Sequence, residues 1–141
     1  LEVVCATPAL GCNTGAYVPA RGPFCFFPYG GWERSTRDFK VLVNVGDFEA
    51  LDWVDESFGD VPENAVEGCP AAGIFVGRNG YGLGKVSTEQ RAFFVVEDGE
   101  EVWYKWYQVL AVKKGAAAVT ISDIRYNMSA AAERGEDVTL A

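Results

Sequence analysis

An internal duplication is the feature that most constrains how this chain of 141 residues folds. The segment Phe39-Lys40-Val41-Leu42 returns 68 residues later as Tyr107-Gln108-Val109-Leu110. The same offset aligns further pairs, which are Phe26 with Phe94, Gly31 with Gly99, Glu33 with Glu101, Val18 with Val86 and Val43 with Ala111. A duplicated unit builds one architecture twice, and two copies of a small β unit typically form a pseudo-twofold barrel or sandwich with ligand sites in its loops. The duplication therefore favours a binding module over an enzyme.

Composition excludes several classes of function. The chain is 49% hydrophobic and 13% aromatic, which is enough for a packed core. Its net charge of −8 repels phosphate backbones, so no nucleic-acid partner is predicted. The sequence contains no histidine, which removes Ser-His-Asp and Cys-His catalysis and His-ligated zinc. We therefore predict a protein that is not an enzyme and has no cofactor or metal.

Four cysteines, Cys5, Cys12, Cys25 and Cys69, are separated by 7, 13 and 44 residues. These spacings do not match zinc-binding patterns, so they predict two disulfides in a secreted protein, with a buried pair of free thiols as the alternative. Three connectivities are open to four cysteines. We favour Cys12–Cys25, which flanks a turn, together with Cys5–Cys69, which would tie the two halves of the chain together.

Short apolar runs between turn residues predict an all-β fold of antiparallel sheets with scarce helix. Strands are expected at 1–6, 16–19, 24–28, 38–43, 48–54, 74–76, from 86, and at 92–96, 102–112 and 119–126, with a helical turn at 129–136. Four glycines in the stretch 77–84 predict a tight loop, and Asp98-Gly99 predicts a hairpin turn. Leu51 and Trp53 are core candidates.

The first copy lacks an N-terminal counterpart of residues 48–70. An unpaired sheet edge would need a cover, so we expect the natural chain to be longer or a second chain to supply the missing strand, and we favour truncation or processing.

Several ordered motifs resemble the natterins. They are FCFFPYGG at 24–31, FKVLVN at 39–44, DVPENAV at 60–66, FVGRN at 75–79, YGLGKV at 81–86 and WYKWYQVL at 103–110. Natterins combine a tandem repeat of the DM-nine type, which is related to mannose-binding lectins, with an aerolysin-like pore-forming module. The resemblance implies a lectin-like head at 1–115, its first repeat truncated at the N-terminus, and a junction strand and tail leading toward the pore module at 116–141.

The resemblance makes Lys85 the first candidate for binding a sugar. Glycines let a backbone approach a ligand closely, so Gly84 is grouped with Lys85. The alternative is a solvated lysine beside a hairpin turn. At the offset of 68, Tyr17 takes the lysine's place in the first copy, and the loop 67–73 offers Glu67 where the lectins carry an aspartate.

Charged and aromatic residues near the turns complete the predicted ligand site. Glu33 and Glu101 can accept paired hydrogen bonds from vicinal hydroxyls, or they are solvated turn acids. Arg78 faces the ligand or, as we favour, forms an ion pair with one of these acids. Trp32 follows a Gly-Gly turn and is expected to be exposed, where an indole can stack on a sugar ring. Asn127-Met128-Ser129 fits the N-glycosylation pattern.

These observations predict a secreted, carbohydrate-binding head, of mannose type if it keeps the lectin specificity, that belongs to a natterin-like toxin or defence protein. Its expected partners are cell-surface glycans, with membranes reached through the pore-forming module, and a homo-oligomer would raise avidity. The alternative is a protein-interaction or small-molecule-carrier module whose sugar site has decayed.

Overall fold

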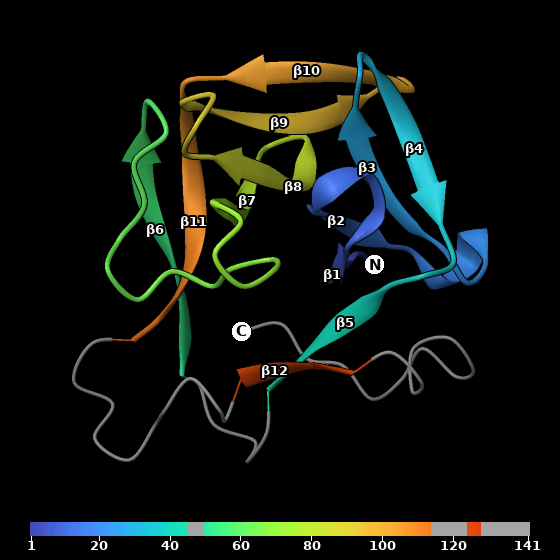
Figure 1. The fold of residues 1–141 in the computed structure, drawn as a ribbon, viewed down its shortest axis with the longest axis horizontal. Helices are drawn as coiled ribbons and strands as arrows, with labels where there is room; N and C mark the ends of the chain where they lie inside the picture. Colours follow the sequence, from blue (N-terminus) through green and yellow to red (C-terminus); the bar gives the residue numbers. More distant parts are fainter. Residues whose placement is uncertain (45–49, 114–123, 128–141) are drawn as a thin grey trace.

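A computed structural model describes residues 1–44, 50–113 and 124–127 of the chain (Figure 1). The predicted helical turn at 129–136 and the first part of the predicted strand at 119–126 lie outside the described residues. The described elements are β1 (Val3–Thr7), β2 (Asn13–Tyr17), β3 (Cys25–Tyr29), β4 (Trp32–Thr36), β5 (Lys40–Asn44), β6 (Leu51–Ser57), β7 (Ile74–Asn79), β8 (Gly82–Ser87), β9 (Ala92–Glu97), β10 (Glu100–Tyr104), β11 (Trp106–Val112), β12 (Ile124–Asn127) and the short 3₁₀ turns η1 (Ala9–Gly11) and η2 (Pro19–Arg21). The all-β prediction is confirmed for these residues.

The strands form one antiparallel sheet in the order β12-β5-β1-β2-β3-β4-β10-β9-β8-β7-β11-β6. Strands β4 and β10 meet in its middle, with Trp32 opposite Glu100. Two backbone hydrogen bonds flank this pair: Glu33 N–H donates to Gly99 O at 2.8 Å, and Glu101 N–H donates to Gly31 O at 2.9 Å. Outward from this pair, the next four strands correspond in chain order on the two sides: they are β3, β2, β1 and β5 on one side and β9, β8, β7 and β11 on the other.

The outer edges of the sheet are covered by strands from different parts of the chain. Strand β6 pairs with β11, with Val54 opposite Val109, and β12 pairs with β5, with Asn127 opposite Val41. Figure 1 shows β12 lying along β5 and β6 beside β11. The segment predicted as a junction therefore supplies a strand to the edge that was expected to need a longer or second chain.

The registers of β2 against β3 and of β8 against β9 correct the sequence alignment by one residue. Ala16 lies opposite Phe26, whereas Lys85 lies opposite Phe94. Because Phe26 and Phe94 are matched at the offset of 68, Ala16 and not Tyr17 takes the place of Lys85 in the first half. A shift of one residue turns a strand side chain to the other face of the sheet, so the correction changes which residue faces the site.

The glycine-rich stretch 77–84 is not a tight loop. Residues Ile74–Asn79 and Gly82–Ser87 pair as a hairpin, with only Gly80 and Tyr81 in the turn. Gly84 serves close packing, because a Cβ at this position would lie 2.0 Å from the carbonyl oxygen of Phe94. Gly15 has the same relation to the carbonyl oxygen of Phe26, also at 2.0 Å. Backbone approach, rather than turn geometry, therefore explains the glycine in each strand.

The sheet curls so that β2 packs on β8, although four strands separate them in the sheet order. The buried Thr14 hydroxyl donates to Gly84 O at 2.7 Å across this contact. Strand β1 is buried along its whole length, with Val3 and Cys5 in one apolar cluster and Val4 in another. Among the described residues, no helix is long and apolar enough to span a membrane.

All four cysteines form disulfides, but the favoured pairing is wrong. Cys5 bonds Cys25 and Cys12 bonds Cys69. Cys5 and Cys25 both point into the cluster that contains Phe27 and Phe39, so they meet in the core of the first half. Cys12 stands just before β2, and the two halves are joined there through Cys69 rather than through Cys5.

Replacement of Tyr107 by phenylalanine should separate the contribution of its hydrogen bond to stability from the contribution of its packing. Its hydroxyl donates to Asp60 O at 2.9 Å, and its ring stacks on Phe93. Burial, which disfavours the phenolate, raises the pKa of Tyr107 to about 12. The unfolded chain loses this proton near pH ~10, so the wild type loses stability as pH rises from ~10.

We expect Tyr107→Phe to lower the free energy of unfolding by about 1 kcal/mol at pH 7. Between pH ~10 and ~12, the free energy of unfolding of this variant should fall less than that of the wild type. Urea unfolding of both proteins at pH 7 and at several pH values above 9 measures this. Parallel losses of stability with pH in the two proteins would contradict the assignment.

Candidate functional site

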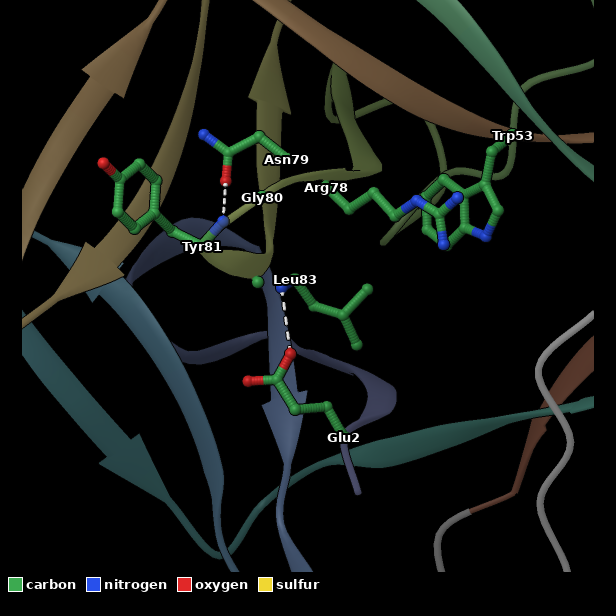
Figure 2. Close-up of a pocket in the computed structure, with 8 residues that line it drawn as sticks. Glu2, Trp53, Arg78, Asn79, Gly80, Tyr81 and Leu83 are labelled. Atoms are coloured by element: carbon green, nitrogen blue, oxygen red, sulfur yellow. Dashed lines mark hydrogen bonds between the residues drawn. The ribbon is translucent and has the colours of Figure 1, made fainter.

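A groove of about 410 Å³ lies at the β7–β8 hairpin (Figure 2). Trp53 comes from β6, while the N-terminal Glu2 precedes β1. The lining residues are Glu2, Trp53, Arg78, Asn79, Gly80, Tyr81, Gly82 and Leu83. The groove therefore joins residues that are far apart in the sequence, because β1 and the β7–β8 hairpin are brought together by the curl of the sheet.

Arg78 is held flat against one wall of the groove. Its guanidinium carbon lies 4.2 Å from the centre of the Trp53 ring, and Figure 2 shows the guanidinium lying over the indole. The Arg78 Nε–H donates to Gln108 Oε1 at 2.9 Å, and Gln108 Nε2 donates to Asp55 Oδ1 at 3.1 Å. Since guanidinium carries five N–H donors, this chain of bonds orients the group while its Nη atoms are left for a ligand.

The hairpin turn forms another part of the groove lining. Tyr81 is 64% exposed, and its ring stacks on Tyr104 with the ring centres 5.8 Å apart. Asn79 Oδ1 accepts the Tyr81 N–H at 2.9 Å, and Glu2 Oε1 accepts the Leu83 N–H at 3.2 Å; Figure 2 draws both bonds. The turn thus presents an aromatic face beside an amide and a carboxylate.

A second pocket, of about 560 Å³, adjoins the groove. It shares Arg78, Asn79 and Gly80 with the groove, and its other lining residues are Asp55, Glu56, Trp106, Tyr107 and Gln108. Arg78 therefore stands between two hollows that both carry aromatic and acidic side chains. On such a surface the planar guanidinium can donate hydrogen bonds to one side of a ligand, while an aromatic ring packs against C–H groups on the other side.

Lys85 is inside the protein, not in either hollow. Its side chain is only 8% exposed and lies between the rings of Tyr29 and Phe94. Its ammonium donates to Asn13 Oδ1 at 2.5 Å, and Glu101 Oε2 lies 4.0 Å away. Burial lowers the pKa of Lys85, and the nearby Glu101 carboxylate opposes that shift. The ammonium is thus satisfied by protein groups.

Of the other charged and aromatic residues predicted for the site, Glu101 lies near Lys85, whereas Glu33, Arg78 and Trp32 have other surroundings. Glu101 accepts the Gly31 N–H at 3.0 Å, whereas Glu33 accepts two bonds from Arg21 at 3.0 and 3.1 Å. Arg78 makes no ion pair with either acid; it lies in the groove instead. Trp32 is 57% exposed on β4, as expected.

Trp53 was predicted as a core residue. It is partly buried against the apolar cluster that contains Leu42 and Leu110, and its ring also contacts the Arg78 guanidinium. Asn127 ends β12, and the rest of its sequon lies outside the described residues.

Comparison with known proteins places this geometry in a family. A family model described as the DM9 repeat matches residues 10–81, which include the β7–β8 turn. The chain belongs to the DM9 repeat family. It is also natterin-like: it is 41% identical to Natterin-4 of Thalassophryne nattereri over 119 residues and 42% identical to Natterin-3 of the same fish over 121 residues. These matches cover 84% and 86% of this chain but only 30% and 33% of the natterins.

This DM9 chain therefore spans about a third of the length of the curated relatives it matches. Within that span, sequence reasoning missed three residues that line the groove, which are Glu2, Asn79 and Tyr81. The Asn79-Gly80 pair is a hairpin signal that points to the turn. The position of Glu2 had no such signal, since it depends on a contact with Leu83 that is 81 residues away in the chain.

Proposed function

We propose that this natterin-like DM9 chain is the carbohydrate-binding head of a secreted protein, and that the groove at the β7–β8 hairpin holds the sugar. The observation that carries the proposal is the Arg78 guanidinium, which is oriented on the Trp53 ring in a groove that Tyr81 also lines. The two disulfides are consistent with secretion. By resemblance to the natterins, the head would bring a pore-forming module to its target membrane, with residues 116–141 as the junction.

The chemistry of the groove suits a sugar ring. Tyr81 offers an exposed aromatic face on which C–H groups can stack. Arg78 and Asn79 can donate hydrogen bonds to hydroxyls, and the Glu2 carboxylate can accept them. Both pockets are open and modest in size, so one contact is weak, and linked copies of the head on a cell surface would raise the avidity.

We further propose that the sheet is a pseudo-twofold pair of DM9 units. The mirrored strand order and the two matched hydrogen bonds between Glu33 and Gly99 and between Glu101 and Gly31 support this relation. The axis would pass between β4 and β10.

A glycan-array screen tests the sugar site. We expect the wild type to bind a defined set of glycans, and Arg78→Ala and Tyr81→Ala each to weaken that binding. Loss of one charge-assisted hydrogen bond corresponds to about 1.5–3 kcal/mol, or about tenfold to hundredfold in affinity.

Arg37→Ala is the matched control, because Arg37 also lies over an aromatic ring, that of Phe24, but stands outside the groove. Unchanged binding in both groove variants, or equal loss in the control, would contradict the site.

An exposed aromatic cluster supports the alternative function, a protein-interaction module. Phe58 and Trp106 form an edge contact with their ring centres 5.2 Å apart, and Lys105 Nζ lies 5.9 Å from the Phe58 ring and 5.6 Å from the Trp103 ring. Large exposed aromatic side chains are enriched at contacts between proteins. A wild-type protein that binds no glycan on the array would favour this surface as the functional one.

A further inference from the structure

A pocket of about 200 Å³ lies on the other side of Tyr81 from the proposed sugar groove. Ala16 and Phe26 form part of its apolar wall. Its charged members are Glu2, Arg21 and Glu33, and Tyr81 also lines it. Glu2 and Tyr81 line both this pocket and the groove, whereas Arg78 and Trp53 line the groove but not this pocket. The two hollows can therefore be tested separately.

The matching place in the second half of the sheet is filled by the protein itself. Lys85 lies opposite Phe94, as Ala16 lies opposite Phe26. Its unbranched butyl chain extends past the Phe94 ring, and its ammonium reaches Asn13 Oδ1 and approaches Glu101. We call the surroundings of this side chain, formed by Phe94, Glu101 and Asn13, the cradle. The second half therefore shows which chemical group such a cradle accepts, namely a primary ammonium on an unbranched carbon chain.

The first half keeps the cradle but not the lysine. Glu33 is the counterpart of Glu101, and Phe26 is the counterpart of Phe94. Ala16 ends at its Cβ, so the volume that the lysine chain takes in the other half is left to the pocket.

A carboxylate stands where the other half has Asn13. The register that matches Ala16 with Lys85 matches Asn13 with Gly82, which has no side chain. The Glu2 carboxylate lies there instead: a Cβ on Gly82 would be 3.1 Å from Glu2 Oε1 and 3.3 Å from Oε2. The first cradle thus has two carboxylates, Glu2 and Glu33, where the second has one carboxylate and an amide.

Arg21 balances only one of these charges. Its guanidinium lies 3.7 Å from the centre of the Phe26 ring and forms both hydrogen bonds to Glu33 at the exposed mouth of the pocket. A carboxylate offers about four lone-pair sites, so Glu33 can accept further bonds while it pairs with Arg21. With Glu2 counted, the pocket keeps an excess of one negative charge.

We propose that this pocket binds a primary ammonium group carried on an unbranched alkyl chain, with the alkyl part beside Ala16 and Phe26 and the ammonium between Glu33 and Glu2. A free polyamine and a lysine side chain of another protein share this chemistry. The pocket shares Glu2 with the sugar groove, but Glu33 lines only the pocket and Arg78 does not line it, so these two residues distinguish the sites.

The first experiment titrates the chain with n-butylammonium and follows chemical shifts of backbone amides by NMR. We expect saturable binding of one equivalent, with the largest shifts around Ala16, Glu33 and Leu83, and no binding of the neutral n-butanol. Titrations with cadaverine and with an acetylated, amidated Gly-Lys-Gly peptide then distinguish the two sources. A wild type whose amide shifts do not saturate with n-butylammonium would overturn the proposal.

Four variants test the two places where an ammonium would bind. Ala16→Lys supplies the missing ammonium from within and should abolish binding, whereas Lys85→Ala opens the second cradle and should bind two equivalents and gain thermal stability from n-butylammonium. Glu33→Gln should weaken n-butylammonium binding about tenfold or more. This variant tests the site if Ala16→Lys does not fold. Arg21→Ala should tighten binding, because it removes the competing cation.

Arg78→Ala separates this proposal from the sugar site. It should reduce glycan binding while n-butylammonium binding stays at the wild-type level. Amine binding that falls with Arg78→Ala but not with Glu33→Gln would place the amine in the groove and overturn the assignment of this pocket.

Discussion

Removal of the Cys12–Cys69 disulfide is expected to lower the free energy of unfolding by about 4 kcal/mol. The two cysteines are 57 positions apart in the sequence, so the bond closes a long loop and restricts the unfolded chain strongly. It also ties the segment before β7 to the start of β2, across the two halves of the sheet. The double variant Cys12→Ala/Cys69→Ala, unfolded in urea beside the wild type, measures the loss.

The Cys5–Cys25 disulfide is the internal comparison. Its cysteines are 20 positions apart, so the same loop argument gives about 3 kcal/mol for Cys5→Ala/Cys25→Ala. Mass spectrometry of the non-reduced, protease-cleaved protein checks the pairing directly. A peptide that links Cys12 to Cys25 would contradict the structure and restore the pairing that spacing favoured.

The Lys85→Ala variant is expected to lose about 3 kcal/mol, since it breaks a largely buried charged pair and leaves its partners behind. Asn13 Oδ1 would lose its donor, and Glu101 would lose the neighbouring ammonium. Lys85→Met keeps most of the apolar chain. The difference in the free energy of unfolding between the two variants therefore measures the cost of the cavity that alanine leaves. If Lys85→Ala unfolds at the wild-type urea concentration, the ammonium contributes nothing to the fold.

The stability of the wild type should also depend on pH through Lys85. Burial lowers the pKa of this ammonium in the folded protein, while the unfolded chain keeps its proton up to about 10.5. In the window below 10.5 the unfolded state binds more protons, so the free energy of unfolding rises with pH. Relative to Lys85→Met, the wild type should therefore gain stability from neutral pH toward 10.5. A constant difference between the two would show that Lys85 titrates alike in both states.

The candidate site was the part of the molecule that local reasoning reached least well. The glycines before Lys85 led to the prediction of a loop. The stretch is a strand instead, and Gly84 is needed there because the backbone of Phe94 lies too close for a side chain. Arg78 was expected beside an acid but lies on Trp53, a ring that β6 contributes from 25 residues earlier. Both outcomes depend on which strands become neighbours, and short-range patterns do not carry that information.

The sequence by itself determined the all-β class, the DM9 relationship, the presence of two disulfides and the exposure of Trp32. Each of these depends on local alternation, spacing or ordered motifs that are visible along the chain. Tertiary structure alone decided the pairing of Cys12 with Cys69, the match of Ala16 rather than Tyr17 with Lys85, and the arrival of Glu2 beside Leu83. The physical reason is that register and sheet curl set which face each side chain takes, and a slip of one residue reverses that face.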